Sequence, residues 1–286
     1  MKSILDFFSP SPRNEKLGLC LSGGGALGFA HIGVIKALEE HNIQPDYIAG
    51  SSMGAIIGTL YAAGLSADEM LQLIHDDKLY KITKLMTFKA SFFKSGISNH
   101  DMLRSLIHEL IPHNSFEALE KRLFICVANL NTAKWEIVAD GSELDKWLAA
   151  SASIPGVFEA VNEKGVFYVD GGLFNNMPAQ ALSEHCATII GVDVIPYIAP
   201  TSLNKPTDTL AFSMRAVQHQ NSRQGRKLCQ FIIEPRAIEE FHEFSFDAYQ
   251  AIYESGYKAA KKYISENKEI LKLATKKKPK SPEGGL

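Results

Sequence analysis

The sequence lacks several features that would place the chain in other classes of protein. It has only four cysteines, and none of them forms a C-x-x-C pair, so neither a disulfide framework nor a cysteine-rich metal site is indicated. The formal net charge is −2, which provides no basic field for nucleic acid. No group of histidine, cysteine and acidic residues has metal-ligand spacing. We therefore expect free, mostly buried thiols in a reducing compartment, no metal, no cofactor and no nucleic-acid partner.

Long apolar segments typical of targeting or membrane insertion are also missing. The first residues have only a short apolar patch, interrupted by Asp6, which does not match a secretory signal. Tyr47–Ala67 contains 21 residues without a charge, close to the length of a membrane span. Its glycines and serines would make a poor span, whereas a strand, a turn and a helix account for all of it. We expect a cytoplasmic protein whose membrane contact, if any, is peripheral.

The remaining composition is that of an ordinary globular protein, with 286 residues, 45% hydrophobic and 22% charged. Strand-like apolar runs alternate with helical periodicity, which indicates a sheet covered by helices on both faces. The predicted fold class is α/β, a three-layer α/β/α sandwich with a mostly parallel central sheet. We predict a loose leader over 1–15, one α/β domain over 16–270 and a basic, disordered tail over 271–286.

Three consecutive glycines, Gly23–Gly25, follow the first apolar run at 17–21. Glycines bury no side chain, so their use here lies in bringing backbone N–H groups close to a negative charge. Together with Gly28 they also match G-x-G-x-x-G, the dinucleotide-binding pattern. That pattern requires an acidic residue at the end of the second strand, and the nearest candidate, Asp46, precedes the strand instead. We therefore favour an oxyanion hole over a dinucleotide site.

The second apolar run, Tyr47–Ala49, leads into Gly50-Ser51-Ser52-Met53-Gly54, which matches G-x-S-x-G. In such a nucleophile elbow, small residues let a strand turn sharply into a helix and leave a serine exposed at the corner. Turns that follow parallel strands open at the same edge of a sheet. We therefore predict that the triple glycine faces Ser52 and that the helix beginning at Met53 directs its positive end toward the same place.

A serine hydroxyl is a poor nucleophile unless a base activates it. Of the nine histidines, His242 has a plausible loop position for a triad, whereas His31 lies on the buried stripe of a helix. Asp170 ends a predicted strand and precedes two glycines, which leaves its carboxylate free, although a hairpin turn is an alternative reading of Asp-Gly. Burial raises a carboxylate's pKa toward neutrality, so we favour a Ser52–Asp170 dyad with Asp170 as general base.

Lysines alternate with aromatic and aliphatic residues over 78–94. The mixture suits a lid or a membrane-surface patch, and an ordinary amphipathic connector is equally compatible, because the periodicity is poor. We expect an acyl chain to lie against Phe158, Phe174 and the 85–93 region.

Four motifs follow one another along the chain: Ser22–Gly28, Gly50–Gly54, the Ser151–Phe158 segment with Ile154-Pro155-Gly156, and Asp170-Gly171-Gly172 leading to Asn175-Asn176-Met177-Pro178. In this order they resemble the patatin-like phospholipase family, and the lack of a signal resembles its small cytoplasmic bacterial members. The resemblance extends from Leu17 to about Val194. It implies a three-layer fold, a histidine-free Ser52–Asp170 dyad that hydrolyses lipid acyl esters, and an oxyanion hole lined by Gly23, Gly24 and Gly25.

The glycine motif departs from the family in one respect. Many members carry arginine or lysine inside it, where this chain has Ala26 or Leu27.

We expect a serine acyl hydrolase of the phospholipase A or lysophospholipase type, which cleaves a lipid or fatty-acyl ester through an acyl-enzyme. Two alternatives stay open: an acyltransferase that uses the same dyad, and a non-catalytic lipid-binding module at a membrane surface.

Overall fold

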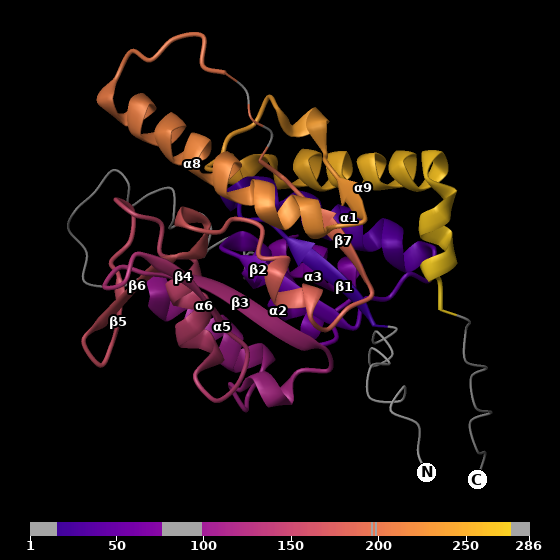
Figure 1. The fold of residues 1–286 in the computed structure, drawn as a ribbon, viewed down its shortest axis with the longest axis horizontal. Coiled ribbons are helices and arrows are strands. Elements are labelled where there is room, and N and C mark those ends of the chain that lie inside the picture. The colour runs from indigo at the N-terminus through magenta and orange to yellow at the C-terminus, as the bar shows by residue number, and fades with distance from the viewer. Residues whose placement is uncertain (1–15, 76–98, 196, 198, 276–286) are drawn as a thin grey trace, which may run out of the picture.

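The computed structural model describes residues 16–75, 99–195, 197 and 199–275. One mixed sheet runs through the molecule in the order β5-β6-β3-β2-β1-β7-β8, with β4 also paired to β3 (Figure 1). The strands are β1 (Leu17–Leu21), β2 (Tyr47–Ser51), β3 (Arg122–Asn129), β4 (Lys134–Val138), β5 (Val161–Glu163), β6 (Val166–Asp170), β7 (Thr188–Val192) and β8 (Phe231–Ile233). The pairs that join β3, β2, β1, β7 and β8 are parallel, and those that add β4, β6 and β5 are antiparallel.

Helices cover both faces of the sheet. They are α1 (Phe29–Glu40), α2 (Met53–Ala62), α3 (Ala67–His75), α5 (Asn99–Leu110), α6 (Leu144–Ser151), α7 (Gln180–Ser183), α8 (Pro206–Leu228) and α9 (Tyr249–Glu266). Because successive strand residues point to opposite faces, Leu19 and Leu21 of β1 join a large core with α1, α2, α6 and α9. Cys20 of the same strand joins a smaller core with α7 and the end of α8. This arrangement confirms the predicted three-layer α/β/α sandwich with a mostly parallel sheet.

The helix α9 packs along α1, and Figure 1 shows the two helices side by side. The contact is close because two glycines replace side chains there: a Cβ on Gly33 would lie 2.1 Å from the Tyr253 carbonyl oxygen, and one on Gly256 would lie 2.1 Å from that of Ala30. α9 is thus packed closely against α1, the helix that follows the triple glycine.

The described part of the chain also bears on the predicted boundaries. Within it, no helix combines the length and the apolar character needed to cross a bilayer. Tyr47–Ala67 is divided between β2, α2 and the start of α3. The predicted domain end at 270 falls within a 3-10 turn, Lys268–Leu273, and the Thr275 amide still donates to the Asn42 carbonyl at 2.9 Å. The leader, most of the tail and the 78–94 segment lie outside the described residues.

Candidate active site

The pairing of β3 explains how Ser52 and Asp170 meet. β4 occupies one edge of β3 over Ile125–Asn129, so β2 and β6 must share the other edge, one after the other. Ser51 at the end of β2 pairs with Cys126, and Asp170 at the end of β6 pairs with Val127. The two strands therefore run toward each other and end at neighbouring positions of the same ladder. Two residues that are 118 apart in the sequence become adjacent for this reason.

The backbone at Ser52 has the geometry of a nucleophile elbow. Its φ of 53° and ψ of −126° lie in a region that residues other than glycine rarely adopt. The turn is tight enough that a Cβ on Gly50 would lie 2.5 Å from the Gly54 carbonyl carbon, and one on Gly54 would lie 2.4 Å from the Leu21 carbonyl oxygen. The two glycines of G-x-S-x-G are therefore needed for close backbone approach, as the motif predicts.

The Ser52 hydroxyl donates a hydrogen bond to Asp170 Oδ2 at 2.5 Å. The other carboxylate oxygen, Oδ1, accepts the Gly172 amide at 2.7 Å, so both oxygens are held in place. Asp170 is only 3% exposed and Ser52 only 5%. Burial raises the pKa of the Asp170 carboxyl from its ordinary 3.8 to about 6, although the hydrogen bonds from Ser52 and Gly172 act in the opposite direction. The structure thus places a carboxyl with a raised pKa in contact with the elbow serine.

Ser151, at the end of α6, links the elbow to β3 by two hydrogen bonds. Its hydroxyl accepts the Ser52 backbone N–H at 3.0 Å and donates to the Cys126 carbonyl at 2.7 Å. Ser51, the other serine of the motif, is fully buried, and its hydroxyl has no hydrogen-bond partner among the described residues. The sequence motif around Ser151 gave no indication that it would contact the nucleophile's own amide.

Of the triple glycine, Gly23 lies close to Ser52, and the three amides of the loop are not equivalent. The Gly23 N–H donates to the Asn176 carbonyl at 3.2 Å and is therefore engaged. For the amides of Gly24 and Gly25, the described residues provide no acceptor. A Cβ on Gly23 would lie 3.1 Å from that of Ser52, which shows how closely the loop approaches the serine. Within the described ranges, the loop therefore has two N–H groups without an acceptor.

The histidines take other places. His31 is fully buried, and its Nε2 lies 2.8 Å from the Ser22 carbonyl oxygen, as expected for a packed helix residue. Burial lowers the pKa of His31 to about 4, so the ring is neutral near pH 7 and donates Nε2–H to that carbonyl. His242 is exposed, and its Nδ1 accepts the Phe244 amide at 3.2 Å within its own turn. Neither ring is hydrogen-bonded to Ser52 or Asp170.

Asn221 of α8 is a residue that the sequence did not mark. Its Oδ1 accepts the Asn176 amide at 2.7 Å, and its Nδ2 donates to the carbonyls of Gly172 and Leu173 at 2.9 and 3.1 Å. It therefore secures the turn that carries the Asp170 carboxylate. Near this turn, Phe174 is partly buried, as is Phe158 beyond α6.

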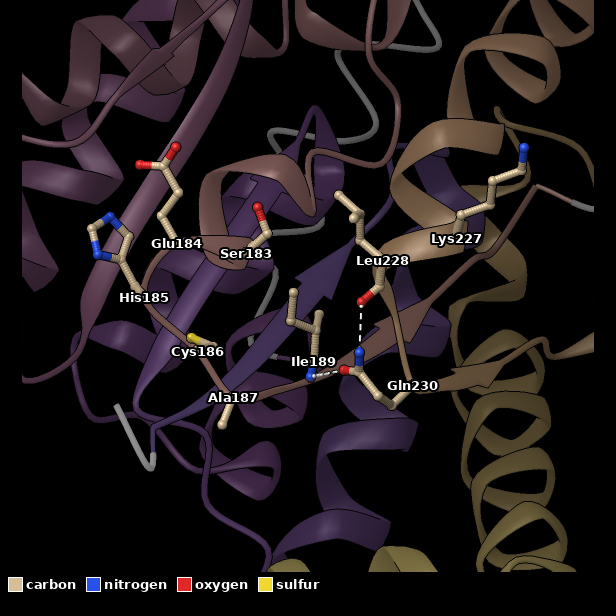
Figure 2. A pocket seen from close by; sticks show the side chains of 9 residues that line it. All are labelled: Ser183, Glu184, His185, Cys186, Ala187, Ile189, Lys227, Leu228 and Gln230. Carbon is tan, nitrogen blue, oxygen red and sulfur yellow. Dashed lines mark hydrogen bonds between the residues drawn. The ribbon is translucent and has the colours of Figure 1, made fainter. Parts of the chain in front are cut away.

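The Ser52–Asp170 dyad lies where the parallel strands end. A hollow of about 270 Å³ lies at the opposite end of the sheet, at the starts of β7 and β8. Figure 2 shows its lining: Ser183, Glu184, His185, Cys186, Ala187, Ile189, Lys227, Leu228 and Gln230. The Gln230 side chain bridges two backbone groups there, as it accepts from the Ile189 amide at 2.7 Å and donates to the Leu228 carbonyl at 3.2 Å. Among the described residues, no cluster of three or more His, Cys, Asp or Glu side chains is placed to hold a metal ion.

Comparison with known proteins agrees with the resemblance of the motifs. The model of the family described as patatin-like phospholipase matches residues 19–183, more than half of the chain. The chain therefore belongs to the patatin-like phospholipase family. It is 28% identical to lysophospholipase NTE1 of Mycosarcoma maydis over 281 residues, and 31% identical to human patatin-like phospholipase domain-containing protein 6 over 194 residues. These matches cover 85% and 62% of this chain but only 14% and 13% of those longer proteins.

Solved structures provide more distant matches. VipD from Legionella pneumophila is 16% identical with a TM-score of 0.46, and the match covers 85% of this chain and 67% of that one. Human GIVD cytosolic phospholipase A2, solved with a fluorophosphonate inhibitor, is 10% identical with a TM-score of 0.46, and the match covers 93% and 60%.

Proposed function

We propose that the protein is a serine hydrolase that cleaves acyl esters of lipids, of the phospholipase A or lysophospholipase type, through Ser52 and Asp170. The observation that carries this proposal is the hydrogen bond from the Ser52 hydroxyl to Asp170 Oδ2 at a strained elbow. A hydroxyl held against a buried carboxylate of raised pKa is the arrangement that general-base activation requires. Family membership and the names of the lysophospholipase and phospholipase relatives support the lipid ester as the substrate.

In the proposed reaction, the Asp170 carboxylate takes the hydroxyl proton as Ser52 Oγ attacks the ester carbonyl. The Gly24 and Gly25 amides and the positive end of α2 stabilise the oxyanion. Asp170 then gives its proton to the departing alcohol oxygen, which leaves an acyl group on Ser52. Water attacks this acyl-enzyme, Asp170 accepts its proton, and the fatty acid departs as Ser52 regains its hydrogen.

The proposed oxyanion hole uses two of the three predicted glycines. Gly23 supports the loop because its N–H is bonded to the Asn176 carbonyl. We propose the Met53 amide, at the first turn of α2, as a third donor to the oxyanion. We propose that the acyl chain runs past Phe158 and Phe174. We also propose that the enzyme is cytoplasmic and that its contact with membranes is peripheral.

The decisive experiment compares Asp170→Asn and His242→Ala with the wild type on short-chain p-nitrophenyl esters, lysophospholipids and diacylphospholipids. We expect Asp170→Asn to lose hydrolysis, whereas His242→Ala retains it. An inactive His242→Ala enzyme with a normal fold would require a triad instead. Adding a lipid alcohol as acceptor separates hydrolysis from acyl transfer, because transfer yields a new ester rather than free fatty acid.

Covalent labelling tests the nucleophile separately. A fluorophosphonate probe should modify Ser52 and leave Ser51 unmodified, because Ser51 is fully buried. If Ser52→Ala left labelling and every lipid-linked effect unchanged, the non-catalytic lipid-binding alternative would replace the hydrolase.

A further inference from the structure

An ion pair outside the dyad touches the glycine loop. Arg215 of α8 donates two parallel hydrogen bonds to Glu243, from Nε to Oε1 at 2.8 Å and from Nη2 to Oε2 at 2.8 Å. The Arg215 side chain is 11% exposed and that of Glu243 is 24% exposed. Bidentate pairs of this kind restrict orientation as well as distance, and low exposure protects them from water and salt. Glu243 is therefore held firmly in its loop between β8 and α9.

The backbone of Glu243 in turn holds the triple glycine. Its carbonyl accepts the Ala26 amide at 2.9 Å. A Cβ on Gly25 would lie 2.3 Å from the same carbonyl oxygen, and the φ of Gly25 is +54°. Ala26 thus turns its N–H toward Glu243, whereas the neighbouring amides of Gly24 and Gly25 keep no acceptor within the described part of the chain. The Glu243 carbonyl thus contacts the backbone directly after Gly24 and Gly25.

We propose that Arg215 is a positioning residue of the oxyanion hole, which acts through Glu243 to hold the Gly24 and Gly25 amides in their working orientation. The inference rests on the proposed function, because it assigns those amides to the oxyanion of ester cleavage. In this proposal the long helix α8 holds two parts of the site. Arg215 acts on the glycine loop, and Asn221 on the same helix secures the turn after Asp170. Nothing in the sequence around Arg215 or Glu243 marks this role.

The test uses Arg215→Gln, Arg215→Lys, Glu243→Gln and the double variant of both Gln changes in the full-length protein. Arg122→Gln is the matched control, because Arg122 pairs with Asp140 at 2.6 Å on the surface, at the start of β3 and away from the dyad. Rates are expressed per active site, titrated with a fluorophosphonate, so that loss of folded enzyme does not enter kcat. A trifluoromethyl ketone carrying an acyl chain measures affinity for the tetrahedral adduct.

Arg215→Gln should lower kcat by about tenfold to a hundredfold with little change in KM, because displaced donors weaken only transition-state binding. The affinity for the ketone should fall by a similar factor. Arg215→Lys should recover part of the loss, and the double variant should lose no more than either single change, since both remove one interaction. The proposal is overturned if kcat of Arg215→Gln matches that of Arg122→Gln, or if the two single losses multiply in the double variant.

Hydrogen exchange gives a readout that does not depend on catalysis. Amides of a peptide covering 23–28 should exchange faster in Arg215→Gln than in the wild type or in Arg122→Gln, whereas a peptide from β3 should exchange equally in Arg215→Gln and the wild type. Unchanged exchange at 23–28 would overturn the role of Arg215. A wild-type protein that neither hydrolyses esters nor reacts with the fluorophosphonate would instead overturn the proposed function.

Discussion

Replacing Asp170 by asparagine should stabilise the protein while it removes the proposed base. The side chains have the same shape, and asparagine can still satisfy the site: its Oδ1 accepts the Gly172 amide, and its Nδ2 donates to Ser52 Oγ. What the substitution removes is a buried negative charge. The penalty for that charge appears as the raised pKa of the Asp170 carboxyl, which burial moves from 3.8 to about 6.

The magnitude follows from the linkage between protonation and folding. A carboxyl whose pKa is higher in the folded state favours folding most below its unfolded pKa, and this contribution is lost as pH rises through the folded pKa. At 1.36 kcal/mol for each pKa unit, a rise from 3.8 to about 6 corresponds to about 3 kcal/mol. The quantity to follow is the free energy of unfolding of Asp170→Asn minus that of the wild type. This difference should be about 3 kcal/mol larger above pH 7 than below pH 4.

Urea unfolding of both proteins between pH 3 and pH 8 measures this difference, and groups that titrate equally in both proteins cancel. Asp145→Asn is a matched control of opposite sign. Asp145 is also buried, but hydrogen bonds from Arg104 and Asn114 overcome the effect of burial and lower the pKa of its carboxyl. Its ionised form supports the fold above the unfolded pKa, so that Asp145→Asn should destabilise at neutral pH and less so in acid. A difference for Asp170→Asn that does not vary with pH would refute the buried-base reasoning.

Three further results are expected. The kcat/KM of the wild type should fall about tenfold per pH unit below pH about 6, because only ionised Asp170 can accept a proton; a flat profile down to pH 5 would exclude it as the base. Gly25→Ala should abolish most activity, since a Cβ would lie 2.3 Å from the Glu243 carbonyl oxygen at a φ of +54°; wild-type kcat would contradict the close packing of this loop. Ser151→Ala should reduce the free energy of unfolding by about 1–3 kcal/mol, because the Ser52 amide loses its acceptor; thermal and urea denaturation would reveal no change if that bond were unimportant.

Local sequence was sufficient to predict those features of the fold and the site that depend on neighbouring residues. The small residues of Gly50–Gly54 predict a sharp strand-to-helix turn, and the strained backbone at Ser52 has that form. The alternation of apolar strands and amphipathic helices was enough to predict the parallel sheet and its two helical layers. The same reasoning could not distinguish the three glycines, because which amide is engaged depends on Asn176, which is remote in the sequence.

The sequence by itself determined the residue types at the site, the turns that display them and the class of fold, because propensities and close backbone approach act over a few neighbouring positions. Tertiary structure decided how these pieces meet. The shared edge of β3 brings Ser52 to Asp170, and α8 contacts the turn after Asp170 through Asn221 and Glu243 through Arg215. Contacts of this range depend on strand register and helix placement, which result from burial of the whole core, and no local pattern encodes them.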